Sequence, residues 1–165
     1  MRVDATGVRL RPVERRDLAT LFEFEIDAES NALAGTKPRT REAFFAAWER
    51  NLVNPEIHAR VIELDGARGD GAVEIVGTIA RFQANGQDHI GYWISRAHWG
   101  KGIASRALES FLDLEPRRPL HATAATNNAR SRRILEKCDF VLVHVRTDQE
   151  TERFLEREIA EFVLG

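Results

Sequence analysis

The sequence is poor in the features that mark exported and membrane proteins. Its 165 residues include a single cysteine, Cys138, which cannot form an internal disulfide and therefore favours a reducing compartment. Residues 1–17 carry scattered charges and no apolar stretch of signal-peptide length. No window approaches the roughly 18 consecutive apolar residues of a membrane span. We therefore expect a cytoplasmic protein with no membrane partner.

The chain also lacks an excess of charge of either sign. Its formal net charge is −2, so bulk charge gives no reason to expect a nucleic-acid partner. The five histidines show no close spacing typical of metal ligands, and we expect no metal. Any anion-binding site must therefore be built locally.

Length and patterning predict one domain over residues 1–165, because 43% hydrophobic residues are enough to fill a single core. Turns are expected at the glycine- and aspartate-rich segment 65–71 and at Asn85-Gly86, and a loop at 30–38. Helices are predicted at 18–26, 40–52, 103–112 and 128–138. Strands are predicted at 8–10, 59–64, 74–82, 89–95, 120–126, 140–145 and 154–163.

The most informative segment is the glycine turn of residues 99–103, between a strand pattern and an amphipathic helix. Gly100 and Gly102 allow a tight turn with inward-pointing amides, which join the unpaired amides and positive dipole end of the following helix. This arrangement favours an anion. The spacing of a P-loop is absent, which argues against a nucleoside triphosphate. A dinucleotide fingerprint is also poorly matched, because Ser105 stands at the position of its third glycine. A turn with a purely structural role stays open as an alternative.

Two motifs together resemble those of the GCN5-related N-acetyltransferase (GNAT) family. They are WGKGIA at residues 99–104 and NARS at 128–131, the latter followed by LEKCDF at 135–140. Trp99 stands where that family usually has Gln or Arg, as in the branch of ribosomal-protein N-terminal acetyltransferases. The resemblance implies an α/β (α+β) fold, with a mixed, mostly antiparallel central sheet of six to seven strands flanked by about four helices.

The resemblance also implies a reaction. Acetyl-CoA would be the co-substrate, and a primary amine of a protein N-terminus or a small molecule would attack its thioester directly. Leu135 replaces the tyrosine that protonates the departing thiolate in many members, so a non-catalytic acyl-CoA sensor is the alternative function. A dinucleotide-binding domain is the third hypothesis. The oligomeric state would be monomer or homodimer.

Site residues follow from the same resemblance. Backbone pairing with the pantetheine arm is expected at Trp93, Ile94 and Ser95, and Asn128 should both cap its helix and hold a pantetheine amide. The coenzyme phosphates should meet Lys101, mostly through its backbone, rather than Arg106, Arg130 or Arg133. The rest of the phosphate loop would be Gly100, Gly102, Ile103, Ala104 and Ser105.

Proton transfer needs an acid and a base. Ser131 is the candidate acid, with a cap within its own helix as the alternative role, and Asp88 is the candidate base, with His89 beside it. Tyr92 is expected to pack in the core, and Cys138 to be a buried spectator. Acidic residues of the first helix and its exit would either attract a cationic amine or form a solvated face; these are Glu25, Asp27 and Glu29.

Overall fold

The computed structural model describes residues 7–66 and 72–165, so most of the predicted turn at 65–71 lies outside the described residues. Within these ranges seven strands form one sheet in the order β1-β2-β3-β4-β5-β7-β6. Neighbouring strands are antiparallel except β4 and β5, which are parallel. The strands are β1 Val8–Pro12, β2 His58–Asp65, β3 Val73–Ala84, β4 Gln87–Ile94, β5 Leu120–Ala125, β6 Val141–Asp148 and β7 Arg157–Leu164.

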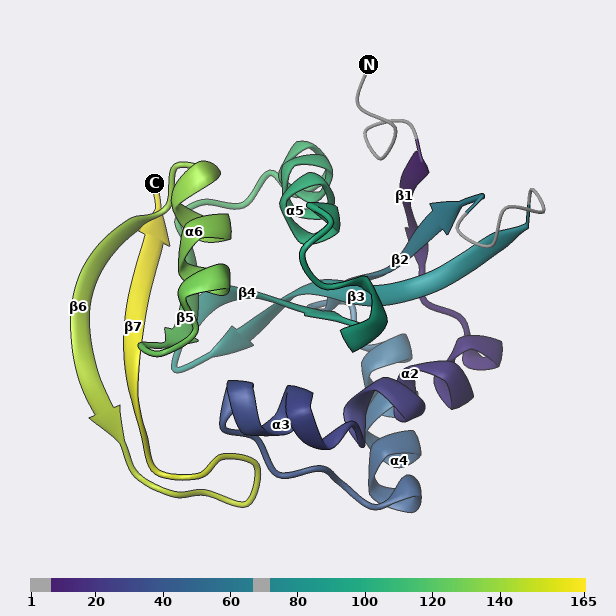
Figure 1. Ribbon diagram of the computed structural model, residues 1–165, viewed down its shortest axis with the longest axis horizontal. Coiled ribbons are helices and arrows are strands. Elements are labelled where there is room, and N and C mark those ends of the chain that lie inside the picture. Colours follow the sequence, from purple (N-terminus) through teal and green to yellow (C-terminus); the bar gives the residue numbers. More distant parts are fainter. Residues whose placement is uncertain (1–6, 67–71) are drawn as a thin grey trace.

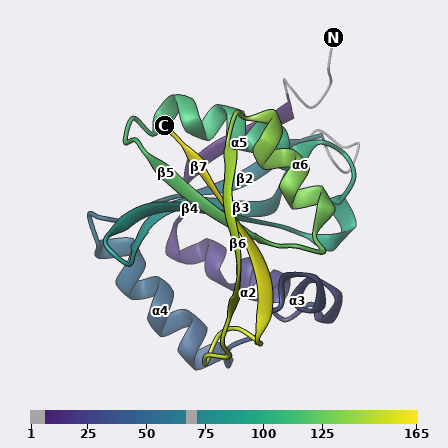
Figure 2. The same ribbon diagram turned by 90° about the vertical axis from the view of Figure 1, so that its left-hand side faces the viewer.

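Helices cover both faces of this sheet (Figures 1 and 2). Helices α2, α3 and α4 lie on one face, and α5 and α6 lie on the other. The predicted fold class is confirmed, with five α-helices among the described residues where about four were expected. The helices are α2 Leu18–Glu25, α3 Ala28–Ala34, α4 Arg41–Val53, α5 Ile103–Leu114 and α6 Ala129–Lys137.

Helix α3 corrects the prediction of a loop over residues 30–38. The Asp27 side chain accepts a hydrogen bond from the Ser30 amide and caps the helix, which ends at Gly35 with a left-handed φ of 71°. The polar residues Ser30 and Asn31, which argued for a loop, are buried. The Asn31 amide donates to the Glu25 carbonyl at 2.6 Å. The prediction was wrong because these side chains satisfy backbone groups instead of facing water.

The sheet separates two apolar cores. Val61 and Ile62 are adjacent in β2, so their side chains point to opposite faces. Val61 packs with Leu18 and Phe44 under α2 and α4, and Ile62 belongs to the larger cluster under α5 and α6, which includes Phe111. All five residues are at most 2% exposed. Helices on both faces are therefore held firmly against the strands between them.

Strands β4 and β5 separate after a short contact. In the part of the chain that the structure describes, they pair at one position, His89 with His121, and Figure 1 shows them running in different directions beyond it. On its other side β4 stays in register with β3 as far as Ile94. Gly77 of β3 permits this approach, because a Cβ there would lie 2.2 Å from the Trp93 carbonyl oxygen. The sheet is thus open along one edge of β4.

A buried ionic cluster fixes the end of α5 to β2 and β3. Glu115 is 1% exposed, and its carboxylate accepts hydrogen bonds from Arg81 Nε at 2.5 Å and from the Arg117 amide at 3.0 Å. His58 Nδ1 lies 2.9 Å away. Burial alone would raise the pKa of Glu115, but these hydrogen bonds outweigh it and lower the pKa to about 2. The ionised carboxylate therefore stabilises the fold.

Glu115→Gln should lower the free energy of unfolding by about 3 kcal/mol at pH 7, because it removes the closest ionic partner of the buried Arg81 and leaves Asp88, 3.9 Å away. The contribution of Glu115 is complete above its ordinary pKa of 4.5 and is lost as the pH falls toward 2. Urea denaturation between pH 7 and pH 3 should therefore show the difference in free energy of unfolding between the variant and the parent protein narrowing toward the acid end. The exposed Glu109 of α5 provides the control Glu109→Gln, and equal stability of both variants at pH 7 would contradict the prediction.

Candidate active site

The glycine turn presents free amides to the space beside α5. Gly100 and Gly102 have φ values of 77° and 78°, a conformation that L side chains rarely adopt. Gly102 is the N-cap of α5 and has no side chain to cap it. The Arg106 amide bonds to the Gly102 carbonyl at 3.3 Å, so the three preceding amides have no acceptor within the helix. Together with the helix dipole, they form an anion cradle.

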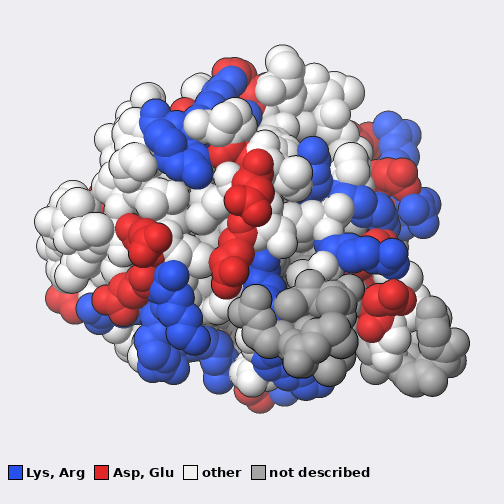
Figure 3. Space-filling model, turned by 90° about the horizontal axis from the view of Figure 1, so that it is seen from above, with Lys and Arg blue, Asp and Glu red and all other residues white. Residues whose placement is uncertain are grey.

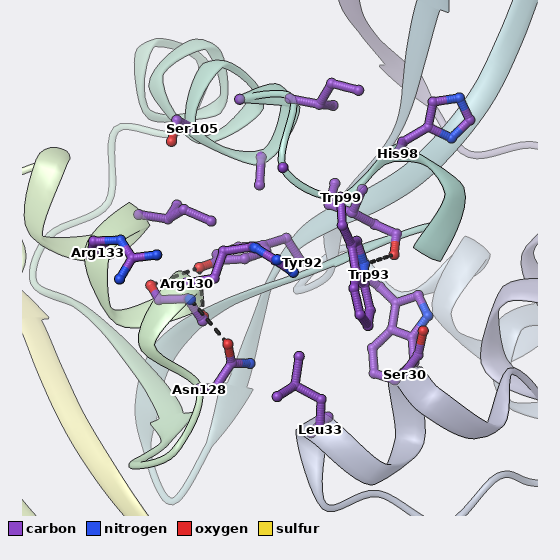
Figure 4. Close-up of a pocket in the computed structure, with 18 of the residues that line it drawn as sticks. Ser30, Leu33, Tyr92, Trp93, His98, Trp99, Ser105, Asn128, Arg130 and Arg133 are labelled. Atoms are coloured by element: carbon purple, nitrogen blue, oxygen red, sulfur yellow. Dashed lines mark hydrogen bonds between the residues drawn. The ribbon is translucent and has the colours of Figure 1, made fainter.

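A cavity of about 350 Å³ lies in front of this cradle (Figure 4). It is bounded by the glycine turn, β4, α6 and α3, and we call it the donor cavity. Arg130, Arg133 and Lys137 line it from α6, whereas none of the described residues that line it is Asp or Glu. The cavity is therefore positively charged, and its donors suit a diphosphate.

Trp99 anchors the glycine turn to the open edge of β4. Its indole Nε1 donates to the Ile94 carbonyl at 3.0 Å, and the Arg130 guanidinium lies 5.2 Å from the centre of its ring. On the other side of the turn, Ser95 Oγ and His98 Nδ1 are 2.6 Å apart. These contacts fix where the cradle faces relative to the strand.

The register of β4 decides which backbone groups face the opening. The Ser95 amide donates to the Val76 carbonyl of β3 at 2.8 Å. Because hydrogen-bonding direction alternates along a strand, Trp93 also points its backbone groups toward β3, and Tyr92 and Ile94 point theirs toward the opening. Of the three residues predicted to pair with a pantetheine arm, only Ile94 faces the opening. Tyr92, which that prediction omitted, also does so.

Helix α6 carries two of the predicted site residues into the same region. Asn128 caps the helix as predicted, and its side-chain oxygen accepts from the Ser131 amide at 3.1 Å. Its Nδ2 group remains as a donor for a ligand. Ser131 Oγ lies 2.8 Å from the Tyr92 hydroxyl, so two hydroxyl groups meet where β4 faces α6.

Tyr92 is a functional candidate to which the sequence interpretation gave a core-packing role rather than a role as an acid. Its ring packs against the larger core, as expected of a core aromatic, but its hydroxyl bonds to Ser131. Burial raises the pKa of Tyr92 to about 12, although the hydrogen bond with Ser131 acts in the opposite direction. The phenol therefore keeps its proton at physiological pH and can supply it to a neighbouring group.

A second cavity, of about 410 Å³, lies toward α2, α3 and α4, and we call it the acceptor cavity. It shares five lining residues with the donor cavity, Ala34, Tyr92, Trp93, Asn128 and Ser131. The hydroxyl pair thus lies where the two cavities meet. Its remaining wall includes five aromatic side chains, Phe24, Phe44, Trp48, Phe82 and Phe154.

The acidic residues near α2 are already paired with arginines. Glu25 is bound by Arg39, with Nη2 to Oε1 at 2.6 Å and a second bond from Nε at 2.9 Å. Asp27 and Glu29 lie 3.0 Å and 3.4 Å from nitrogen atoms of Arg96. The proposed attraction of a cationic amine by these three carboxylates therefore loses its basis, because each faces an arginine.

Most predicted coenzyme-binding residues line the donor cavity, and three predicted site residues do not. Lys101 is exposed. The amide of Ser95 is hydrogen-bonded to β3, and its hydroxyl is hydrogen-bonded to His98. Asp88 lies at the start of β4, 3.5 Å from Arg117 Nη1, and it lines neither cavity. Those that do line the donor cavity are Trp93, Ile94, Gly100, Gly102, Ile103, Ala104, Ser105, Asn128 and Ser131.

The cationic side chains that line the donor cavity are not the one that the sequence analysis selected for the coenzyme phosphates. Lys101 was expected at the phosphates mostly through its backbone, and the cationic side chains that line the cavity are those of Arg130, Arg133 and Lys137. These three residues follow each other at spacings of three and four, which places them on one face of α6. That spacing was a readable signal, because the same helix carries Asn128 and Ser131 at its start.

Two other classes of site find no support in the described residues. No group of three or more His, Cys, Asp or Glu side chains there is arranged to hold a metal ion. No helix in the described ranges is long and apolar enough to cross a membrane. Figure 3 shows acidic and basic side chains intermingled on the face seen from above, in line with the small net charge.

The chain matches a family model described as an acetyltransferase (GNAT) domain over residues 8–141. No curated protein matches it at a significant level. Among solved structures, it is similar to a spermidine N-acetyltransferase from Vibrio cholerae in complex with CoA and spermine, with a TM-score of 0.78, 16% identity and coverage of 96% of this chain and 95% of that chain.

Two further solved structures are also similar. RimL, a ribosomal L7/L12 alpha-N-protein acetyltransferase, has a TM-score of 0.77 at 16% identity, covering 96% of this chain and 90% of that one. RimJ from Mycobacterium smegmatis, in complex with CoA-disulfide, has a TM-score of 0.72 at 24% identity, covering 95% and 81%. At these identities the likeness shows a shared fold.

Proposed function

The chain belongs to the GNAT acetyltransferase family, and on this premise we propose that it transfers an acetyl group from acetyl-CoA to a primary amine. One observation carries the proposal. The Tyr92 and Ser131 hydroxyls, 2.8 Å apart, lie where a positively charged cavity meets a second cavity lined by aromatic side chains. Such a junction lets a donor and an acceptor approach the same proton source.

In this proposal the donor cavity holds the coenzyme. The amides of Ile103, Ala104 and Ser105 receive the diphosphate at the start of α5, and Arg130 and Arg133 neutralise its charge. The pantetheine arm lies along the open edge of β4, against the backbone of Tyr92 and Ile94. An amide of this edge that faces the thioester oxygen stabilises the negative charge developing there during attack.

The acceptor amine then attacks the thioester carbon as a neutral nucleophile. The new C–N bond forms, the C–S bond breaks, and the amine gives up a proton to water. The departing thiolate takes the Ser131 hydroxyl proton, which Tyr92 replaces through their hydrogen bond, and solvent reprotonates Tyr92. Glu25 is the carboxylate among the described residues lining the acceptor cavity. Because Arg39 pairs with it, we assign it no role as base.

Turnover is the direct test. Purified protein with acetyl-CoA and a panel of primary amines should release free thiol in proportion to acetylated amine, detected by a thiol reagent and by mass spectrometry. Reactions lacking either the amine or the protein serve as controls. Calorimetric binding of coenzyme A without thiol release for any amine would support the alternative, a non-catalytic acyl-CoA sensor, and would overturn the proposal.

A further inference from the structure

The acceptor cavity has more positive than negative side chains in its wall. Of the described residues that line it, three are arginines, Arg39, Arg153 and Arg157, and one is an acid, Glu25. Glu25 is already bound through two nitrogen atoms of Arg39. Arg153 and Arg157 therefore remain as cations that this carboxylate does not fully neutralise.

Arg157 is held rigidly beside the junction of the two cavities. Its Nη1 donates to the Ala34 carbonyl at 2.5 Å, and Ala34 lines both cavities. The guanidinium lies 4.1 Å from the centre of the Phe154 ring. Its aliphatic stem passes so close to Gly35 that a Cβ there would be 2.8 Å from Arg157 Cδ. The fork is thus preorganised, and side-chain entropy lost on ligand binding is small.

The hydrogen-bonding capacity of Arg157 is not used up. Its Nε is buried and has no hydrogen-bond partner among the described residues. A neutral carbonyl on Nη1 does not compensate the charge of this half-buried guanidinium. Burial lowers the pKa of Arg157 and outweighs the opposing effect of Asp148, which is the direction expected of a cation that lacks a close carboxylate.

Arg153 adds a second cation on the same side. Its Nη1 donates to the Lys37 carbonyl, and its distance to the nearer Glu25 oxygen is 3.8 Å. Burial and the neighbouring Arg39 lower the pKa of Arg153 despite the charge of Glu25. Two arginines that donate to backbone carbonyls, with one carboxylate 3.8 Å from Arg153 and aromatic side chains beside them, form a site for an organic anion.

From this geometry we infer that the acceptor is an amine with an acidic group beside its amino nitrogen, as in a free α-amino acid with an apolar side chain. The inference rests on the proposed function, since it places the amine at the junction. Arg157 reaches the carbonyl of Ala34 at that junction, so an oxyanion bound to its fork lies close to the reacting nitrogen. The aromatic wall takes the side chain of the acceptor.

This charge pattern disfavours two other classes of acceptor. A polyamine would bring further positive charges toward Arg153 and Arg157. The N-terminus of a protein carries a neutral peptide group where the amino acid carries its carboxylate. The predicted order of specificity is therefore amino acid first, then its neutral amide, and polyamine last.

Matched acceptors test the inference. We expect L-phenylalanine to be acetylated with a kcat/KM at least about 30-fold above that of L-phenylalanine amide, because charge-assisted bidentate hydrogen bonds are lost with the amide. The aminophosphonate analogue of phenylalanine separates carboxylate from phosphoryl recognition. Spermidine and a peptide with N-terminal phenylalanine complete the panel. A preference for the amide, the peptide or spermidine would overturn the inference while leaving the proposed function intact, whereas no turnover with any of these amines would count against the proposed function itself.

Variants locate the anion site. Arg157→Gln should raise the KM for phenylalanine about 30-fold and change the KM for its amide less than about threefold, and Arg153→Gln should act in the same direction. The exposed Arg50 of α4 provides the control Arg50→Gln. Calorimetric binding of coenzyme A checks that each variant is folded. Equal losses for acid and amide in a variant that binds coenzyme A normally would overturn the assignment.

Discussion

Gly102→Glu should weaken coenzyme A binding at least about 100-fold, measured by calorimetry. The φ of 78° at Gly102 strains any L side chain. A glutamate would also place a negative charge beside the amides of α5 that should receive the diphosphate. Both effects act on the same few atoms, which is why the expected loss is large.

Backbone strain alone must be separated from the loss of the anion site. Gly86, in the turn between β3 and β4, has a similar φ of 74° and is exposed, and a Cβ there would meet nothing within 4 Å beyond its chain neighbours. Gly86→Glu therefore carries the same strain and charge at a site that lines neither cavity. Equal coenzyme affinity in the two variants would show that the glycine turn does not hold the diphosphate.

Tyr92→Phe and Ser131→Ala should each lower kcat about 100-fold with little change in coenzyme affinity, the scale of general acid catalysis. The double variant should be no slower than the slower single one, because the two hydroxyls, 2.8 Å apart, deliver one proton as a unit. Steady-state kinetics on all four proteins measures this. Additive losses would contradict a shared relay.

A better leaving group distinguishes proton delivery from a structural role of the two hydroxyls. A thioester of an acidic aromatic thiol expels a thiolate that needs no proton from the protein. With this donor, the variants should approach the rate of the parent protein, compared at the same donor concentration. If the ratio between variant and parent stays the same for both donors, Tyr92 and Ser131 serve only to hold β4 against α6.

The features that sequence patterns predicted well depend on neighbouring residues. The glycine turn, the Asn128 cap and the strand before the glycine turn are each set within a few positions. Helix α3 was missed because Ser30 and Asn31 were treated as solvated, whereas tertiary packing buries them. Local polarity does not reveal burial, since burial depends on what packs over a segment.

The parts of the site that the sequence did not indicate depend on distant contacts. Tyr92 meets Ser131 across 39 positions, and Arg157 reaches Ala34 across 123. No periodicity within either segment records these pairs. Asp88 is a residue that the sequence indicated and the structure places elsewhere. It was predicted to be the base because it enters the central strand, but it lies beside Arg117 and lines neither cavity.

The two cavities draw on different parts of the chain, and this division bears on how such a protein diversifies. The wall of the donor cavity comes largely from residues 92–137, whereas the acceptor cavity also takes in residues 21–48 and 153–157, toward the two ends of the sequence. Substitutions in these outer segments can change the choice of acceptor while the coenzyme site is inherited intact. The choice of acceptor can therefore change in evolution without a change in how the coenzyme is bound.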